Sequence, residues 1–485
     1  MKSTLVTDAF ERAGKLLSAR KNGDRGRAPE MPGGLPWLGH ALEFWRHPIE
    51  LLTRGRERFG EVWRFKLAGK EVTVLTGPKA NLAFFHAPPD VLSARECYQF
   101  TVPVFGQGVA YDVPTEVMDQ QLGWVHPALS ERRLRTYARV MAEEADSFLD
   151  GWGERGELDL FDATNQLTTF IATRCLLGDE FRTHLTADFA RMYHDLDRGM
   201  SLLAYFAPHA PLPAFKKRDR AREEVSRLLS GVMRARHSRQ DSAVHEDFLQ
   251  TLMDARYEDG ASLPDPVISG LLLTLIFAGQ HTSAVLAAWT GILLHQNPRF
   301  LPPLVGELDE LLGGGAELTF ECIRRMTLLE RAVKEAERMR PPLVMLMRAV
   351  LKDMDYMGFT LPPGSLAMVS PAVSHRLAEV FTHPQKYDPD RFAPGREEDR
   401  KVQYSLLGFG GGKHRCIGMV FAYQQIKVIW ASILRRYQIE LVEREYLPNY
   451  TTFVVGPHRP CTIRYRRRQR AVVGAGSSVS AGVAP

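Results

Sequence analysis

The residue best suited to chemistry is Cys416, which lies in the glycine-rich run FGGGKHRCIG from Phe409 to Gly418. A long helical pattern follows this run. A cysteine at the start of a helix meets the positive end of the helix dipole and free backbone amides, which favour the thiolate. Glycines would also let a flat ligand approach the loop backbone. A lone cysteine is more often a buried structural residue, but the dense pattern around this one favours a ligand site.

A polar cluster interrupts an otherwise apolar stretch from Asp265 to His295. We expect Asp265 at the N-cap of a helix and Pro266 at its first position. The cluster runs from Gly279 to Ser283, in the middle of the stretch, where polar groups without partners would cost about 1–3 kcal/mol each. The stretch could span a membrane in an integral membrane protein, but its polar middle and charged flanks favour a core helix. We therefore predict that these polar groups face a ligand.

Glu335 and Arg338 are three residues apart, on one face of a predicted helix. Such a pair is usually solvated at the surface and contributes about 0–1 kcal/mol. Here Pro341 and Pro342 end the helix, and a further arginine, Arg391, follows in the segment PDRF. We expect Arg391 to join the pair in a buried network.

Along the chain the motifs follow the order of the cluster at 279–283, Glu335 and Arg338, Arg391, and the loop at 409–418. In this order they resemble those of the cytochrome P450 superfamily, over roughly residues 30–465. Within it the chain is similar to the sterol 14α-demethylases, whose two signatures are the segment 279–283 and an earlier group of residues: Tyr98, Phe100, Pro103, Phe105, Gly106, Gly108, Val109, Tyr111 and Asp112. The resemblance implies a mainly α fold with small β-sheets, in which haem lies between a long distal helix and a proximal cysteine loop. Helical patterns at residues 132–148 and 218–236 and strand patterns at 62–65, 72–75 and 366–370 agree with it.

The resemblance implies that Cys416 is the axial thiolate ligand of the iron of haem b. Buried carboxylates need cationic or hydroxyl donors, and the haem propionates would have four such partners: Arg348, His414, Tyr98 and Tyr111. A structural role on the proximal side falls to three residues: Glu335, Arg338 and Arg391. Together these assignments describe the haem side of the site.

On the distal side most P450 enzymes have an acid before the threonine, whereas His281 takes that place here, as in sterol demethylases. Thr282 would hydrogen-bond to the oxygen being activated, and His281 would relay protons, since imidazole ionises near neutral pH. Asp197 resembles the acidic partner of this histidine, although an aspartate is usually just an exposed acid. An aromatic and aliphatic set suits a steroid nucleus, although each member could also be ordinary core: Phe100, Phe105, Ala278, Leu343, Met345 and Phe453.

One segment departs from the family's pattern. Many relatives place a basic residue on the helix after Tyr111 to bind a propionate, whereas this chain has MDQQL at residues 118–122. Either Trp124 or His126 substitutes, or haem retention relies on Arg348 and the tyrosines.

Composition sets the wider limits. The 485 residues carry 62 basic and 57 acidic side chains, a net charge of +5 that is too small and dispersed to favour nucleic acid as a partner. The five cysteines lack the spacing of a disulfide framework or zinc site. We predict an amphipathic or flexible segment at residues 1–30, without a signal peptide or membrane anchor, a catalytic domain at 31–465, and a basic, then Ala/Gly/Ser-rich, linker or tail at 466–485.

The resemblance implies a haem-thiolate monooxygenase that removes the 14α-methyl group of a lanosterol-like sterol precursor in sterol biosynthesis. The methyl group would pass through alcohol and aldehyde stages and leave as formic acid. O₂ is the co-substrate, and electrons would come from NAD(P)H through a ferredoxin or flavoprotein reductase, which the linker suggests could be fused to the natural chain. We expect a cytoplasmic enzyme and leave peripheral membrane contact open. A P450 hydroxylating a fatty acid or another steroid position, and a haem-thiolate sensor without turnover, are the alternatives.

Overall fold

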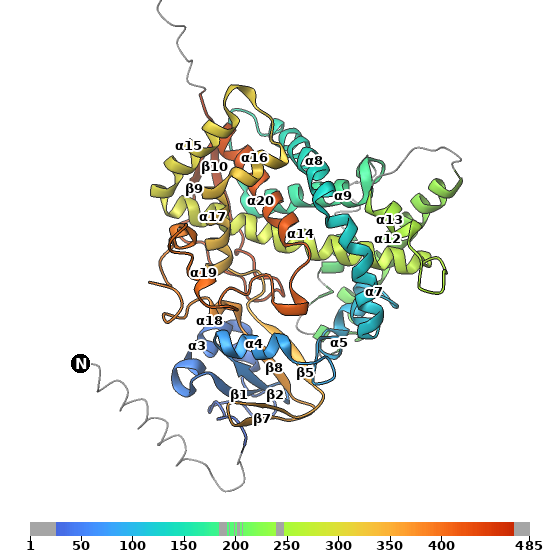
Figure 1. Cartoon of the computed structure of the whole chain (residues 1–485), viewed down its shortest axis with the longest axis vertical. Helices are drawn as coiled ribbons and strands as arrows, with labels where there is room; N and C mark the ends of the chain where they lie inside the picture. Colours follow the sequence, from blue (N-terminus) through green and yellow to red (C-terminus); the bar gives the residue numbers. More distant parts are fainter. Residues whose placement is uncertain are drawn as a thin grey trace, which may run out of the picture.

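The computed structural model describes residues 26–183, 192–193, 195–197, 199–200, 204–205, 207–238 and 247–469. Most of the predicted N-terminal segment and the Ala/Gly/Ser-rich tail therefore lie outside the described residues. Figure 1 shows a helical part around α14 and a smaller sheet-rich part to which the first strands belong. The predicted class, mainly α with small sheets, is confirmed.

The apolar stretch forms α14 (Asp265–Gln296), which packs against α9 (Leu160–Thr183), α17 (Thr327–Met339) and α20 (Met419–Arg436). Its N-cap is Pro264, so the helix begins at Asp265, one residue earlier than predicted, because the extended Pro264 already ends the preceding loop. Among the described residues α14 is the one helix long and apolar enough to cross a membrane, and most of it is buried. The prediction of a core helix is therefore confirmed.

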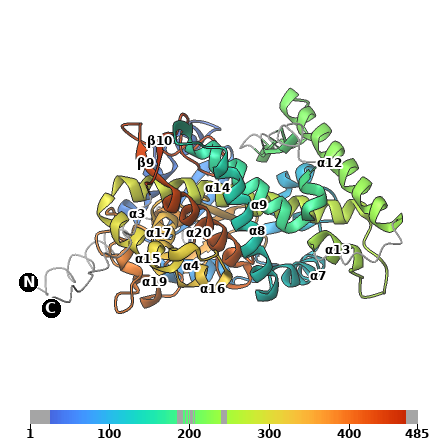
Figure 2. The same cartoon turned by 90° about the horizontal axis from the view of Figure 1, so that it is seen from above.

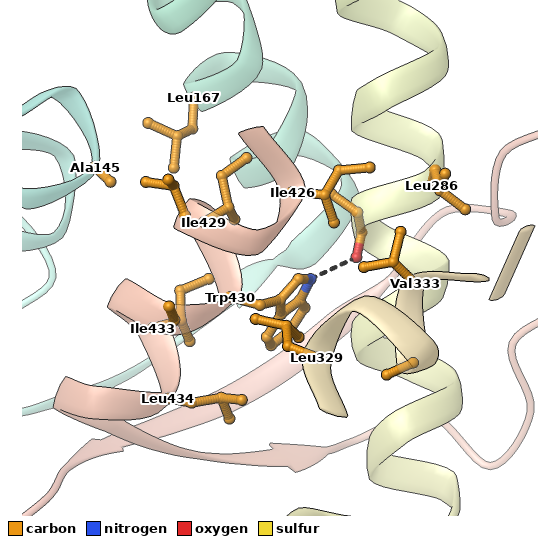
Figure 3. Close-up of a cluster of buried hydrophobic side chains, with 14 of the residues drawn as sticks. Ala145, Leu167, Leu286, Leu329, Val333, Ile426, Ile429, Trp430, Ile433 and Leu434 are labelled. Carbon is orange, nitrogen blue, oxygen red and sulfur yellow. Dashed lines mark hydrogen bonds between the residues drawn. The ribbon is translucent and has the colours of Figure 1, made fainter. Parts of the chain in front are cut away.

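The packing of α20 on α14 depends on Trp430 and Gly291. The indole N–H of Trp430 donates to the carbonyl of Ala287 at 2.8 Å, and Figure 3 shows this bond among the apolar side chains of α20, α17 and α14. A Cβ atom at residue 291 would lie 1.8 Å from the Trp430 ring, so only glycine permits this approach. The contact fixes α14, and with it the polar cluster at residues 279–283.

The remaining helices surround this centre, and the patterns predicted at 132–148 and 218–236 belong to α8 and α12. Seen from above, α8, α9 and α20 lie side by side next to α14, while α12 and α13 lie at one end of the molecule (Figure 2). The other helices are α2 (Ala41–Arg46), α3 (Pro48–Phe59), α4 (Pro78–His86), α5 (Ala94–Cys97), α6 (Val102–Phe105), α7 (Thr115–Val125), α8 (Glu131–Asp150), α12 (Pro213–Ser238), α13 (Phe248–Asp254), α15 (Leu301–Leu312), α16 (Phe320–Arg325), α18 (Pro371–Ser374) and α19 (Glu398–Lys401).

The largest sheet has the strand order β1-β2-β8-β5-β3. As predicted, β1 and β2 form an antiparallel hairpin, in which Val62 pairs with Leu75. Strand β8 then pairs parallel to β2 and antiparallel to β5, which carries Arg348 towards the helical part. The strands of this sheet are β1 (Val62–Leu67), β2 (Lys70–Leu75), β3 (Leu92–Ser93), β5 (Leu346–Val350) and β8 (Leu366–Val369).

Two smaller sheets complete the β structure. One has the order β4-β10-β9, and the other is the hairpin of β6 and β7. Their strands are β4 (Arg155–Asp159), β6 (Met354–Tyr356), β7 (Phe359–Leu361), β9 (Tyr437–Leu441) and β10 (Thr462–Arg467).

Candidate active site

A cavity of ≈ 410 Å³ lies between α14 and the glycine-rich loop. Its lining is mostly apolar, and both Cys416 and Thr282 belong to it. Four residues predicted to contact substrate also line it: Phe105, Ala278, Leu343 and Phe453. The fold therefore brings the cysteine and the threonine, 134 residues apart by number (416 − 282), to one apolar space.

Phe100 and Met345 lie outside the lining of this cavity. The ring of Phe100 packs against those of Phe453 and Tyr98, with centroids 5.7 Å and 6.0 Å away, so it supports two residues that do line the cavity. Met345 packs in a neighbouring apolar cluster with Val344. Both residues form a second row behind the cavity wall.

The glycines of the cysteine loop serve the backbone and its packing. Gly410 has φ +71°, and a Cβ atom there would lie 2.6 Å from the carbonyl oxygen of His414. At Gly411 a Cβ atom would lie 2.6 Å from the ring of Tyr404. Glycine is needed at both positions for the loop to fold, a different reason from the expected approach of a flat ligand.

The local geometry of Cys416 also differs from the expectation. Helix α20 begins at Met419, after the cysteine, whose backbone N–H donates to the carbonyl of Phe409 at 2.8 Å. Burial raises the pKa of the Cys416 thiol, and a hydrogen bond from the Gly418 amide only partly opposes this. The Gly418 amide acts in the predicted direction, but burial outweighs it, so the prediction that the helix dipole and nearby backbone amides favour the thiolate is wrong for the protein alone. A bound metal cation would favour it instead, since a coordinating thiol loses its proton to the metal.

The other four cysteines are buried thiols away from the cavity. Burial raises the pKa of Cys97 to about 11 and that of Cys461 to about 12. The pKa values of Cys175 and Cys322 are raised by burial as well. Cys416 alone among the five lines the cavity.

Arg348 brings a buried positive charge to the cavity. One of its N–H groups donates to the carbonyl of Phe84 at 2.8 Å. Burial lowers the pKa of Arg348 to about 10, so it is still cationic at neutral pH. Among the described residues no carboxylate lies within ion-pair distance of it. Since a buried charge needs a counter-ion, Arg348 fits an anionic group of a bound ligand.

Hydroxyl and imidazole groups line the cavity together with Arg348. The rings of Tyr98 and Tyr111 lie 5.1 Å apart, and burial raises the pKa of both, so both hydroxyls keep their protons and can donate. Burial and the positive charge of Arg348 lower the pKa of His414 to about 4, so its imidazole is neutral. All four residues predicted to hold the haem propionates therefore meet at one wall.

The departing segment has no side chain in this wall. Trp124 and His126 do not line the cavity, and His126 is exposed. Gln121 instead holds the loop before residue 111: its amide donates to the carbonyl of Gly108 at 2.7 Å and accepts from the N–H of Ala110 at 3.1 Å. Of the two alternatives left by the sequence, the geometry favours reliance on Arg348 and the tyrosines.

The distal polar cluster divides between two faces of α14. The hydroxyl of Thr282 lies on the cavity side and donates to the carbonyl of Ala278 at 2.7 Å. His281 lies outside the cavity lining, and its Nδ1 is 4.0 Å from Oδ1 of Asp197. Both side chains of this pair are partly exposed. A partly exposed histidine, next in sequence to the threonine that faces the cavity, thus lies close to a partly exposed acid.

A family model described as Cytochrome P450 matches residues 29–462. The chain belongs to the cytochrome P450 family. It is 38% identical over 447 residues to the lanosterol 14-alpha demethylase of Rattus norvegicus, covering 91% of this chain and 88% of that protein. It is 37% identical over 446 residues to the sterol 14alpha-demethylase of Mycolicibacterium vanbaalenii, covering 91% and 98%. The resemblance to P450 enzymes and to sterol demethylases is confirmed.

Among solved structures, the retinoic acid-bound cyanobacterial CYP120A1 superposes with a TM-score of 0.81 at 23% identity. The match covers 92% of this chain and 100% of that one, which confirms the P450 fold. P450 enzymes bind haem, use O₂ and receive electrons from a redox partner. The lone cysteine, the unpaired Arg348 and the adjoining cavity are a donor set that fits haem.

The predicted network of this P450 is fully buried. Glu335 accepts from Nε and Nη2 of Arg338, both at 2.8 Å, and from Nε of Arg391 at 3.0 Å. The sequence missed a fourth member, Glu398, which accepts from Nη1 of Arg391 at 2.7 Å. Glu398 also accepts from Nη2 of the partly exposed Arg396 at 2.8 Å, and Arg396 in turn pairs with Asp388, so each arginine has an acid. Remaining N–H groups of Arg338 donate to backbone carbonyls, including that of His375 at 2.9 Å, and fix the segment before the cysteine loop.

The sequence also gave no sign of Glu337, which lines the cavity. It lies two residues after Glu335 and resembles any helix glutamate in sequence. Its Oε2 accepts a hydrogen bond of 2.5 Å from the hydroxyl of Tyr423. Burial raises the pKa of Glu337 to about 7, although the bond from Tyr423 lowers it.

Proposed function

We propose that this P450 removes the 14α-methyl group of a lanosterol-like sterol. Likeness to animal and bacterial sterol demethylases along 91% of the chain carries the proposal. The methyl group is oxidised to an alcohol and then to an aldehyde, and it leaves as formic acid while a ring double bond forms. Each oxidation consumes O₂ and two electrons.

Bound haem supplies the activation of O₂ and the insertion of an oxygen atom into a C–H bond. Cys416 would ligate it, and four residues that line the same cavity would hold its propionates: Arg348, His414, Tyr98 and Tyr111. The charge of Arg348 would then have the counter-ion that no described residue provides. Phe105, Leu343 and Phe453 exclude water and hold the rigid, apolar steroid, with Phe100 and Met345 supporting them from behind.

Thr282 holds a proton at the cavity. Its hydroxyl hydrogen is now given to the carbonyl of Ala278, and rotation about χ1 would direct it into the cavity. His281 and Asp197 lie behind it on the solvent side of α14, 4.0 Å apart. We assign them the delivery of protons from solvent to the threonine, with Asp197 orienting the imidazole.

Residues 31–465 act as the catalytic domain, and Glu335, Arg338 and Arg391 hold its proximal side. Electrons come from NAD(P)H through a ferredoxin or flavoprotein reductase, either separate or fused. We place the enzyme in the cytoplasm, in peripheral contact with the membrane from which a sterol must be taken.

Turnover of the haem-loaded protein with lanosterol, NADPH and a reconstituted reductase tests the proposal. We expect formic acid and the 14-demethylated sterol, both detected by mass spectrometry. Lauric acid serves as the competing substrate class. Conversion of lauric acid, with no product from lanosterol although the haem is intact and reducible, would reject the sterol assignment.

The proton pathway has its own test in Asp197→Asn, with Asp195→Asn on the same segment as the matched control. We expect the first variant to lower the rate of sterol turnover about tenfold and to enlarge the solvent deuterium isotope effect, because the imidazole loses its ionised partner. The control should change neither. Equal effects in both variants would remove Asp197 from the pathway.

A further inference from the structure

Glu337 is a buried carboxylate to which the reaction above gives no role. It is 2% exposed, and its hydrogen-bond donors are the hydroxyl of Tyr423 and the backbone N–H of Gly408. Within the described part of the chain, no cationic side chain lies within ion-pair distance of it. Buried carboxylates are normally paired. Glu335, two residues earlier on the same helix, is paired with two arginines. The lack of an ion pair at Glu337 is therefore a property of its own surroundings and not of the helix.

That place is the boundary between the haem side and the solvent side of the cysteine loop. Glu337, Phe409 and Gly410 line both the ≈ 410 Å³ cavity and a second pocket of ≈ 960 Å³. A Cβ atom at Gly408 would lie 2.4 Å from the carboxylate, so the loop packs directly on it. After burial, the negative charge of Glu337 further raises the pKa of the Cys416 thiol. The carboxylate therefore acts electrostatically on the ligand position without contacting it.

The charged groups around Glu337 are committed to other partners. Lys334, on the same helix, lies 3.2 Å from Asp399 of α19, and Lys427, on α20, lies 2.8 Å from Glu330. Lys334 lowers the pKa of Glu337 and Asp399 raises it, while the second pocket provides a route for solvent protons. With its pKa at about 7, Glu337 can change its charge near neutral pH.

We propose that Glu337 takes up a proton when the haem iron of this P450 is reduced and that its charge sets the reduction potential. One electron from the redox partner converts ferric to ferrous iron, and one solvent proton passes through the second pocket to the carboxylate. Because a nearby negative charge disfavours the added electron, ionised Glu337 lowers the potential. The proposal rests on the haem-thiolate assignment and is independent of the substrate.

Spectroelectrochemical titration of the substrate-free, haem-loaded protein between about pH 6 and pH 9 tests this. In the wild type we expect the potential to fall as the pH rises and to level off once Glu337 is fully ionised. Glu337→Gln should show a flat profile over this range. At the alkaline end its equilibrium constant for reduction should be larger than that of the wild type, about tenfold for a charge roughly 12 Å from the iron at an effective dielectric constant near 20.

Glu330→Gln is the matched control, because Glu330 lies two turns earlier on α17 and is paired with Lys427. It should keep the wild-type pH profile. Tyr423→Phe removes the hydrogen bond that lowers the pKa of Glu337, so the pH-dependent range should move upwards. A wild-type profile in Glu337→Gln, or the same loss in Glu330→Gln, would overturn the proposal.

Absorption spectra with carbon monoxide confirm thiolate ligation in each variant, and the ferric spectra confirm an unchanged spin state. Should Glu337→Gln fail to hold haem, Tyr423→Phe decides, since an unshifted profile there contradicts the proposal. None of these results depends on sterol turnover. Failure of this proposal is therefore distinguishable from failure of the proposed function.

Discussion

This P450 has two sets of buried charges, and they are satisfied differently. In the network, Glu335 and Glu398 balance Arg338 and Arg391, and all four are buried. At the cavity wall, Arg348 and Glu337 are also buried, yet neither has an oppositely charged partner among the described residues.

The paired charges stabilise the fold, whereas the unpaired charges serve a bound ligand. A closed network loses stability whenever one member is removed, because its partner is left buried and uncompensated. An unpaired buried charge already destabilises the folded state, so its removal should lower the free energy of unfolding little. Its removal should instead change ligand binding in the cavity or the reduction potential of the iron. Variants of the network should therefore lose stability, whereas variants of the unpaired charges should keep stability and change haem binding or reduction.

The largest effect should follow Glu335→Gln. The variant leaves Arg338 with no acid and Arg391 with Glu398 alone, which should lower the free energy of unfolding by about 3–5 kcal/mol. Urea unfolding of the haem-loaded protein, followed by circular dichroism, measures it. A loss as small as that of a surface ion pair, about 1 kcal/mol or less, would contradict the contrast.

Glu337→Gln should raise the free energy of unfolding relative to the wild type as the pH rises towards 7. The folded-state pKa of about 7 lies above the ordinary value of 4.5, so between these values the folded protein binds more protons than the unfolded chain. This carboxyl therefore stabilises the fold fully below pH 4.5, and its contribution falls by about 1.4 kcal/mol per pH unit up to pH 7.

The variant lacks this decline. The difference between its unfolding free energy and that of the wild type should therefore shift in the variant's favour from pH 5 to pH 8. Urea titrations at the two pH values measure this shift. A constant difference between the two proteins would show that Glu337 titrates normally in the fold.

Arg348→Met should lower haem retention rather than the stability of the fold. The substitution keeps much of the side-chain length and removes a buried charge that no acid in the described part of the chain balances. We expect haem to transfer to excess apomyoglobin about ten- to a hundredfold faster, equivalent to about 1.4–2.8 kcal/mol, within the range for a lost hydrogen bond to a charged group. Arg348→Lys, which keeps the charge, should recover part of the loss. Equal rates in all three proteins would exclude Arg348 as a propionate partner.

Features that depend on local spacing could be predicted from the sequence, whereas pairings between distant residues could not. Cys416, Thr282 and the Glu335–Arg338 pair follow from spacing, because a helix fixes which neighbours share a face and a glycine run marks a tight loop. Partners joined only by the fold were missed. Glu398 lies 63 residues after Glu335 (398 − 335), and nothing near it in sequence suggests a place in the network.

Apolar residues show the same limit. Phe100 and Phe453 have identical chemistry, and only the packing of the rings, 5.7 Å apart, puts the second at the cavity and the first behind it. The cysteine loop was located correctly from sequence, but the clash at Gly410 was not predicted, because it involves the backbone of residues that follow it. Position along the chain predicts local geometry, whereas burial and pairing depend on the whole fold.

The smallest effects should come from the two tyrosines, and they sharpen the contrast within the cavity wall itself. The hydroxyl of Tyr98 accepts a hydrogen bond of 3.3 Å from the N–H of Met347, whereas that of Tyr111 has no hydrogen-bond partner among the described residues. Tyr111→Phe should therefore weaken haem binding by about 0.5–1.5 kcal/mol and lower the free energy of unfolding of the haem-loaded protein by no more than this amount.

Tyr98→Phe should weaken haem binding by a similar amount and also lower the stability of the fold, by about 1 kcal/mol, because the N–H of Met347 loses its acceptor. Haem transfer and urea unfolding, measured on both variants, separate the two effects. If Tyr111→Phe destabilised the fold as much as Tyr98→Phe does, the hydroxyl of Tyr111 would be hydrogen-bonded within the protein. It would then not be one of the donors that, with Arg348, hold the haem propionates.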